Sequence, residues 1–229
     1  MAGGIPGDLM GYYAAFLDLT DRMCLVVGGG PEAAEKARGL LIAGADVAVV
    51  WDEVGDEVTR MADAGEVELR RHRFTPEDLE GCFVVIDASL DEATGAEVFL
   101  HARSQRVLCN VLDRPARCDF IAPAIVRRGP LQVAISTAGR SPFMASQLRR
   151  ELELTIDEAQ GELVELVGRL RDRLRAAGVS LEIQNQVYAR VPGSGALDLL
   201  REGNADGAAA VIDACAQDLV DLGTPGGAA

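Results

Sequence analysis

Residues 23–33 read MCLVVGGGPEA, and this stretch decides the fold. The apolar run Met23–Gly28 predicts a buried strand, and the helical pattern Ala33–Ala43 follows the three glycines. A glycine turn between a strand and a helix is where the pyrophosphate of a dinucleotide binds in α/β folds, although such a turn can also be only structural. The candidate residues for this binding are Gly28, Gly29, Gly30, Pro31, Glu32 and Ala33.

The alternation of strand and helix patterns continues along the chain. Strand-like runs lie at 47–50, 67–69, 83–86 and 107–111, with helical stretches at 54–64 and 91–103 between them. Such alternation predicts an α/β fold with a doubly wound, parallel, Rossmann-like sheet. We therefore predict an NAD-binding Rossmann domain over residues 1–112.

After residue 112 the pattern changes. Two strand-like runs, Phe120–Val126 and Leu131–Ser136, flank Arg127-Arg128-Gly129-Pro130, which predicts a hairpin turn. From Ser141-Pro142 onward the pattern is helical and indicates a long amphipathic helix. We predict a small β dimerisation region over 113–142, a helical C-terminal domain over 143–222 and a disordered tail over 223–229.

The overall composition excludes several classes of function. The 229 residues are 48% hydrophobic with a net charge of −14, which argues against a nucleic-acid or anionic-membrane partner. The five cysteines are odd in number and lack a Cys-x-x-Cys spacing, so they predict reduced core residues of a cytoplasmic protein, with a catalytic cysteine as the alternative. With no leader pattern and no long apolar stretch, we expect neither export nor a membrane span.

Residues 106–150 form a basic island in this acidic chain. They hold eight arginines and two aspartates, a net charge of +6, which leaves −20 for all other residues. One of the two aspartates, Asp113, lies in the run 110–115, NVLDRP. This contrast predicts a pocket for a polyanionic small molecule, because local cations overcome the repulsive field of the rest.

Two further loops could contact a dinucleotide. Trp51 and Asp52 follow the second strand, where an acidic residue holds the adenosine ribose; alternatively, Trp51 packs on the sheet and Asp52 starts a helix. No basic residue at 51–53 could receive a 2′-phosphate, which favours NAD over NADP. Asp87 and Ser89 follow the fourth strand, and Asp87 either binds a ribose hydroxyl or is solvated or caps the next helix.

Seven segments, in order, resemble one known family. They are 16–19 FLDL, 26–30 VVGGG, 36–38 KAR, 110–113 NVLD, 118–124 CDFIAPA, 128–137 RGPLQVAIST and 139–142 GRSP. Between Tyr13 and about Leu152 the chain resembles the precorrin-2 dehydrogenases, including those that are also sirohydrochlorin ferrochelatases and those fused into siroheme synthase. We find no usable match after Leu152.

The resemblance implies an activity and a site. The activity is the NAD⁺-dependent oxidation of precorrin-2 to sirohydrochlorin, a tetrapyrrole with eight carboxylates, by a homodimer; bifunctional members also insert Fe²⁺. The family's catalytic aspartate maps onto Asp113, the candidate general base, unless that carboxylate only pairs with Arg114 or Arg117. The candidate substrate-binding residues are Asn110, Arg114, Arg117, Ser136, Thr137 and Arg140.

The chain also departs from the family pattern. The family's loop after the fourth strand commonly reads Ala-Ala-Thr-Asp, with an asparagine a few residues later, whereas this chain has Asp87-Ala88-Ser89-Leu90 and Gly95. An altered loop leaves two alternatives: a non-catalytic tetrapyrrole carrier or NAD-responsive regulator, and a chelatase without dehydrogenase activity. His72 and His101 show no metal-ligand spacing, so we predict no resident metal.

Overall fold

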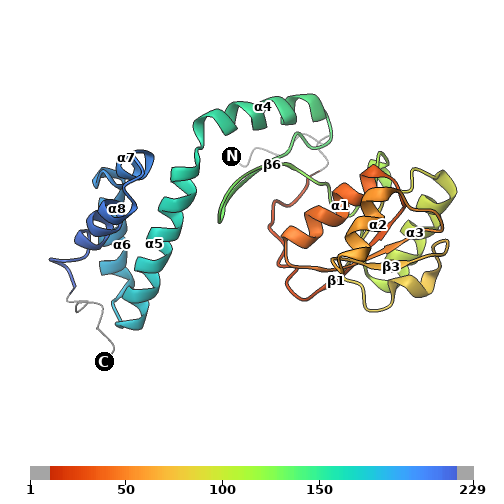
Figure 1. Ribbon diagram of the computed structural model, residues 1–229, viewed down its shortest axis with the longest axis horizontal. Helices are drawn as coiled ribbons and strands as arrows, with labels where there is room; N and C mark the ends of the chain where they lie inside the picture. The colour runs from red at the N-terminus through yellow and green to blue at the C-terminus, as the bar shows by residue number, and fades with distance from the viewer. Residues whose placement is uncertain (1–10, 221–229) are drawn as a thin grey trace, which may run out of the picture. The chain divides into compact units, whose positions relative to one another are not determined.

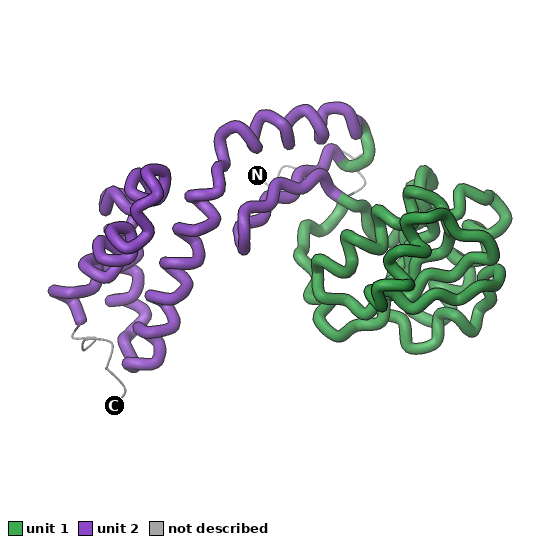
Figure 2. The backbone as a smooth tube through the Cα atoms, in the orientation of Figure 1, with its two compact units in different colours: residues 1–122, 138–140 green, residues 123–137, 141–229 purple. Residues whose placement is uncertain are grey.

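The computed structural model describes residues 11–220. The chain divides into two compact units, residues 1–122 with 138–140 and residues 123–137 with 141–229 (Figure 2). The disordered tail predicted at 223–229 lies outside the described residues. Within residues 11–220, no helix is both long and apolar enough to cross a membrane.

The first unit is built on a parallel sheet. Its strands are β1 (Met23–Val27), β2 (Asp46–Val50), β3 (Glu68–Arg70), β4 (Val84–Asp87) and β5 (Leu108–Val111). They lie in the order β3-β2-β1-β4-β5, and every neighbouring pair is parallel. This order changes direction beside β1, so the loops after β1 and β4 flank the crevice where ligands of open α/β sheets bind.

Helices cover both faces of this sheet (Figure 1). Helices α1 (Pro31–Ile42) and α2 (Asp56–Asp63) pack on the face that holds Val26 and Val49. Helix α3 (Glu92–Gln105) and the 3₁₀ turn η1 (Pro76–Leu79) pack on the opposite face. Because neighbouring strand residues point to opposite faces and both faces are covered, the central strand β1 is apolar throughout, whereas the short edge strand β3 is mainly polar. The predicted doubly wound sheet is confirmed.

The second unit begins with an antiparallel hairpin, β6 (Ala124–Arg128) and β7 (Leu131–Ile135). The predicted hairpin is present, but Arg127 and Arg128 pair with Gln132 and Leu131 inside it, so the turn is only Gly129-Pro130. Gly129 has a φ of 52°, which glycine adopts without strain. The strand predicted from Phe120 starts later, because Phe120 packs against the core of the first unit.

Helices make up most of the second unit's described residues after the hairpin. They are α4 (Pro142–Thr155), α5 (Glu158–Ala176), α6 (Leu181–Arg190), α7 (Ala196–Arg201) and α8 (Ala205–Ala214), with the 3₁₀ turn η3 (Val191–Gly193). A further 3₁₀ turn, η2 (Pro115–Arg117), lies in the first unit. Ser141 caps α4 by accepting a hydrogen bond from the Met144 N–H, so the helix begins where the pattern predicts. The long helix ends at Thr155, because Asp157 and Gln160 form a capping box that starts α5. Leu170, Leu174 and Ile212 are at the centre of this unit's core.

Candidate functional site

The glycine turn joins β1 to α1. Gly28 has a φ of 132°, and a Cβ added there would stand 2.7 Å from the Ala88 carbonyl oxygen, so the turn after β1 lies against the loop after β4. A Cβ on Gly29 would stand 2.9 Å from Trp51 Cδ1. These two glycines are therefore required by the packing of neighbouring loops as well as by the turn itself.

Gly30 is the N-cap of α1, and no side chain caps this helix end. A Cβ on Gly30 would approach only the flexible carboxylate of Glu32, at 3.3 Å. Pro31 occupies the first turn, Glu32 is exposed, and Ala33 is fully buried against the sheet. A helix N-terminus without a side-chain cap, directly after a glycine turn, fits the pyrophosphate of a dinucleotide.

The loop after β2 contains a contact that the sequence did not reveal. The Arg73 guanidinium carbon lies 4.0 Å from the centre of the Trp51 ring, and Arg73 Nε donates to Asp52 Oδ2 at 2.7 Å. The alternative interpretation is half right: Trp51 packs on the sheet, but α2 starts at Asp56, behind an N-cap at Gly55. Arg73 follows β3, within the basic run 70–73, which was its one signal in the sequence.

Asp87, the last residue of β4, is 2% exposed. Its Oδ1 accepts a hydrogen bond from the Ser89 N–H at 3.0 Å, and burial raises the pKa of its carboxyl group against the opposing effect of Ser89. The interpretations of Asp87 as a solvated residue or a helix cap are wrong: it faces the core like Val85, and Asp91 caps α3. A Cβ on Gly95 would stand 2.8 Å from Asp87 Oδ2, so the two departures from the family pattern are structurally coupled.

The raised pKa of Asp87 predicts that the stability of the folded chain depends on pH. Because its pKa is raised in the folded state, ionisation above about pH 4 favours unfolding, and the penalty grows as pH rises through the folded pKa. We expect Asp87→Asn to raise the melting temperature at pH 7, with a gain that shrinks toward pH 4. Asp91→Asn is the opposite control, because hydrogen bonds from Thr94 lower the pKa of Asp91; equal pH profiles for both variants would contradict the assignment.

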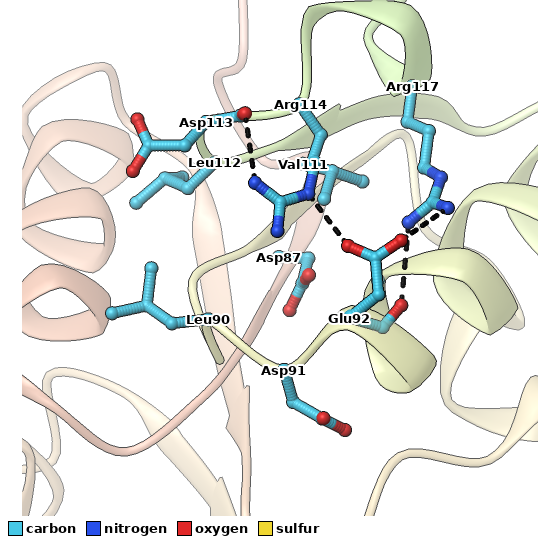
Figure 3. A pocket seen from close by; sticks show the side chains of 10 residues that line it. Asp87, Leu90, Asp91, Glu92, Val111, Leu112, Asp113, Arg114 and Arg117 are labelled. Atoms are coloured by element: carbon cyan, nitrogen blue, oxygen red, sulfur yellow. Dashed lines mark hydrogen bonds and ion pairs between the residues drawn. The ribbon is translucent and has the colours of Figure 1, made fainter.

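A pocket of about 190 Å³ opens where β4 and β5 end. It lies below the usual range of roughly 300–1,000 Å³ for sites that enclose a drug-sized ligand, so it fits one end of a larger molecule. The lining residues are Asp87, Leu90, Asp91, Glu92, Gly95, Val111, Leu112, Asp113, Arg114 and Arg117 (Figure 3). The candidate base Asp113 and the candidate cofactor residue Asp87 thus line one pocket.

Asp113 is exposed and adopts the left-handed conformation, with a φ of 58°. Its carboxylate points away from Arg114 and Arg117, both of which bind Glu92 instead (Figure 3). Arg114 Nε lies 2.7 Å from Glu92 Oε2, and Arg117 Nη2 lies 2.8 Å from Oε1. Within the described chain, the Asp113 carboxylate makes no ion pair with either arginine, contrary to the alternative interpretation.

The other candidate substrate residues are spread over both units. Asn110 Nδ2 donates to the Phe120 carbonyl at 2.8 Å and so anchors the loop that carries Asp113. Thr137, in the second unit, exchanges hydrogen bonds of 3.1 Å with the backbone of Ser141. Ser136 and Arg140 are exposed.

The cysteines are free thiols, and three of them are buried: Cys24, Cys109 and Cys215. Burial raises the pKa of Cys24 to about 11 and that of Cys109 to about 12, so both thiols stay protonated near neutral pH. This chemistry does not favour a catalytic cysteine at either position. Among residues 11–220, no three His, Cys, Asp or Glu side chains are grouped to hold a metal ion.

Two family models match the chain. Residues 15–124 match a family described as putative NAD(P)-binding, and residues 128–153 match the central region of sirohaem biosynthesis proteins. Siroheme synthase of Methylococcus capsulatus is 39% identical over 203 residues, which cover 89% of this chain and 43% of that protein. Siroheme synthase 2 of Yersinia enterocolitica is 41% identical over 166 residues, 72% of this chain and 35% of that protein. This chain therefore spans less than half the length of these relatives.

A solved structure is similar over most of this chain. SirC, a precorrin-2 dehydrogenase, superposes with a TM-score of 0.71 at 25% identity, over 89% of this chain and all of that one. The match to the Methylococcus protein covers 203 residues and so also reaches past Leu152, where the resemblance of the sequence segments ends. The chain carries an NAD(P)-binding domain followed by a sirohaem-synthesis central region, and it belongs to the family of the siroheme synthase N-terminal region and precorrin-2 dehydrogenase.

Proposed function

We propose that this protein oxidises precorrin-2 to sirohydrochlorin with NAD⁺, in siroheme or cobalamin synthesis. The observation that carries the proposal is one pocket, at the carboxyl edge of the sheet, that has an exposed carboxylate on its wall and lies next to the loop that packs on the glycine turn. The likeness to SirC over that protein's full length supports it. A single assay that follows tetrapyrrole and NADH absorbance tests it.

The residues of the cofactor site have distinct tasks in this proposal. The turn at Gly28–Ala33 holds the pyrophosphate at the N-terminus of α1, and Trp51 with Asp52 lies at the adenosine end. The loop of Asp87 and Ser89 packs on the turn and borders the pocket. When bound, NAD⁺ supplies a hydride acceptor.

Asp113 is the proposed general base. Oxidation of precorrin-2 removes a hydride from carbon and one proton, and an exposed carboxylate oxygen that is not engaged by a cation can accept that proton. The left-handed backbone conformation of Asp113 directs its carboxylate away from Arg114 and Arg117 on the same loop (Figure 3). Asn110 keeps this loop in place through the Phe120 carbonyl.

Arg114 and Arg117 are the proposed partners of substrate carboxylates. They already share one carboxylate, that of Glu92, which shows that their guanidinium groups can converge on a single anion. A substrate carboxylate would replace Glu92. Ser136, Thr137 and Arg140 stay predicted substrate residues.

Glu92→Gln tests this exchange. We expect the variant to bind uroporphyrin, an octacarboxylate probe, up to about fivefold more tightly, because an exposed ion pair no longer competes. Arg114→Ala combined with Arg117→Ala should weaken the same binding. Fluorescence titration of the probe measures both effects. Unchanged affinity in all variants would remove the two arginines from the site.

We also propose a homodimer in the cytoplasm. Helix α4 packs on the hairpin, yet it presents exposed apolar side chains, with Phe143 70% and Leu154 90% exposed. Exposed side chains of this size favour association. We also propose, as the sequence predicts, that the chain has three domains, 1–112, 113–142 and 143–222. Light scattering of the full chain gives the oligomeric state.

Iron insertion is a second candidate activity, with Fe²⁺ as a substrate. The same exposed Asp113 carboxylate could accept the pyrrole N–H protons that a metal replaces. The assay run with sirohydrochlorin and Fe²⁺ separates the alternatives. Metal insertion without NADH formation from precorrin-2 would indicate a chelatase, and tetrapyrrole binding without either reaction would indicate a carrier or an NAD-responsive regulator.

A further inference from the structure

Arg73 has no task in the proposed reaction, although it lies at the carboxyl edge of the sheet. Its side chain is 60% exposed, and its guanidinium group covers the Trp51 ring while Nε binds Asp52. The planar group is therefore fixed on two sides, by an aromatic face and by a carboxylate. Such pre-organisation is uncommon for an exposed arginine, which usually samples many rotamers.

Backbone hydrogen bonds place this arrangement beside the glycine turn. The Trp51 N–H donates to the Arg70 carbonyl at 3.1 Å, which aligns the ends of β2 and β3. The Gly55 N–H donates to the Gly29 carbonyl at 2.9 Å, which holds the loop after β2 against the turn. In dinucleotide-binding folds this position meets the adenosine ribose, where an acidic residue takes a 2′-hydroxyl and an arginine takes a 2′-phosphate.

Donors remain available on Arg73. Asp52 uses Nε alone, and within residues 11–220 neither Nη1 nor Nη2 donates to a protein acceptor. These two nitrogens carry the N–H groups that bind a phosphate bidentately. The Asp52 carboxylate neutralises the guanidinium and repels a phosphate dianion.

We infer that Arg73 is a 2′-phosphate-binding residue and that its pairing with Asp52 sets the preference between NAD and NADP. The inference rests on the cofactor site of the proposed function. Asp52 accepts the 2′-hydroxyl of NAD, whereas NADP must bind against the Asp52 charge. The ion pair of Arg73 with Asp52 then sets the preference for NAD, and NADP binds at the same site with lower affinity.

Calorimetric titration of the full chain with NAD⁺ and with NADP⁺ tests this assignment without any turnover. The ratio of NADP⁺ to NAD⁺ affinity should rise about 10- to 100-fold in Asp52→Asn, the range of one charged hydrogen bond. The gain should disappear in Asp52→Asn combined with Arg73→Met, which keeps a side chain over Trp51. Asp52→Asn combined with Arg71→Met is the matched control, because Arg71→Met removes an exposed arginine two positions away.

The probes 2′,5′-ADP and 5′-ADP repeat the comparison without the nicotinamide half. The inference is overturned if Asp52→Asn leaves the ratio unchanged, or if the double variant keeps the gain. It is also overturned if Asp52→Asn combined with Arg71→Met loses the gain as well, since the effect would then be one of general charge. If the unaltered chain binds neither NAD⁺ nor NADP⁺, the proposed cofactor site fails together with the inference.

Discussion

Asp113→Asn should lower the rate of NADH formation from precorrin-2 by about 10²- to 10⁴-fold, the usual contribution of a general base. Asparagine keeps the size of the side chain and its tolerance of the left-handed backbone, so the loop should hold its shape. What disappears is the ability to accept a proton. Single-turnover measurements of NADH absorbance give the chemical step directly.

Glu97→Gln is the matched control, because it also neutralises one exposed carboxylate, on α3 outside the pocket lining. NAD⁺ affinity, measured by calorimetry, should be retained in both variants. Full turnover in Asp113→Asn would rule Asp113 out as the base and leave the oxidation to another group.

Gly161→Ala should destabilise the second unit by about 1–3 kcal/mol, the range for overpacked sites. In an exposed helix the same change stabilises by roughly 1 kcal/mol. Here a Cβ would stand 2.7 Å from the Arg128 carbonyl carbon and closer still to its oxygen, because α5 packs directly on the end of β6. The backbone on both sides must move to admit one methyl group.

Gly168→Ala in the same helix is the comparison, since a Cβ there meets nothing within 4 Å. We expect it to stabilise by roughly 1 kcal/mol. Urea unfolding followed by circular dichroism measures both variants. If both substitutions changed the free energy of unfolding by the same amount and in the same direction, the contact between α5 and β6 would not be tight.

The sheet could be predicted from the sequence because each strand and turn is marked by residues that are close together in the chain. Apolar runs such as Met23–Gly28 mark strands buried on both faces, and the glycine turn marks the change to a helix. Element ends were less well placed. The strand expected from Phe120 begins at Ala124, because contacts of Phe120 with the first unit's core, distant in sequence, override local propensity.

The candidate site was harder to predict because its contacts join distant segments. Glu92 is 22 residues from Arg114, and Asp52 is 21 residues from Arg73, so no spacing rule brings either pair together. The burial of Asp87 is hard to predict for a related reason: a carboxylate at a strand end is usually solvated, and the space left by Gly95 on α3 allows this one to be buried.

The hairpin of β6 and β7 has a consequence for assembly. A two-stranded ribbon is marginal by itself, and within residues 11–220 each of its strands pairs only with the other, so both are edge strands whose outward N–H and carbonyl groups lack a sheet partner. Exposed Arg127 and Gln132, opposite each other, keep the ribbon polar at its tip. The chain thus carries a ready template for strand addition, in which a neighbour's backbone could complete the sheet, with charge near the tip to discourage indiscriminate aggregation.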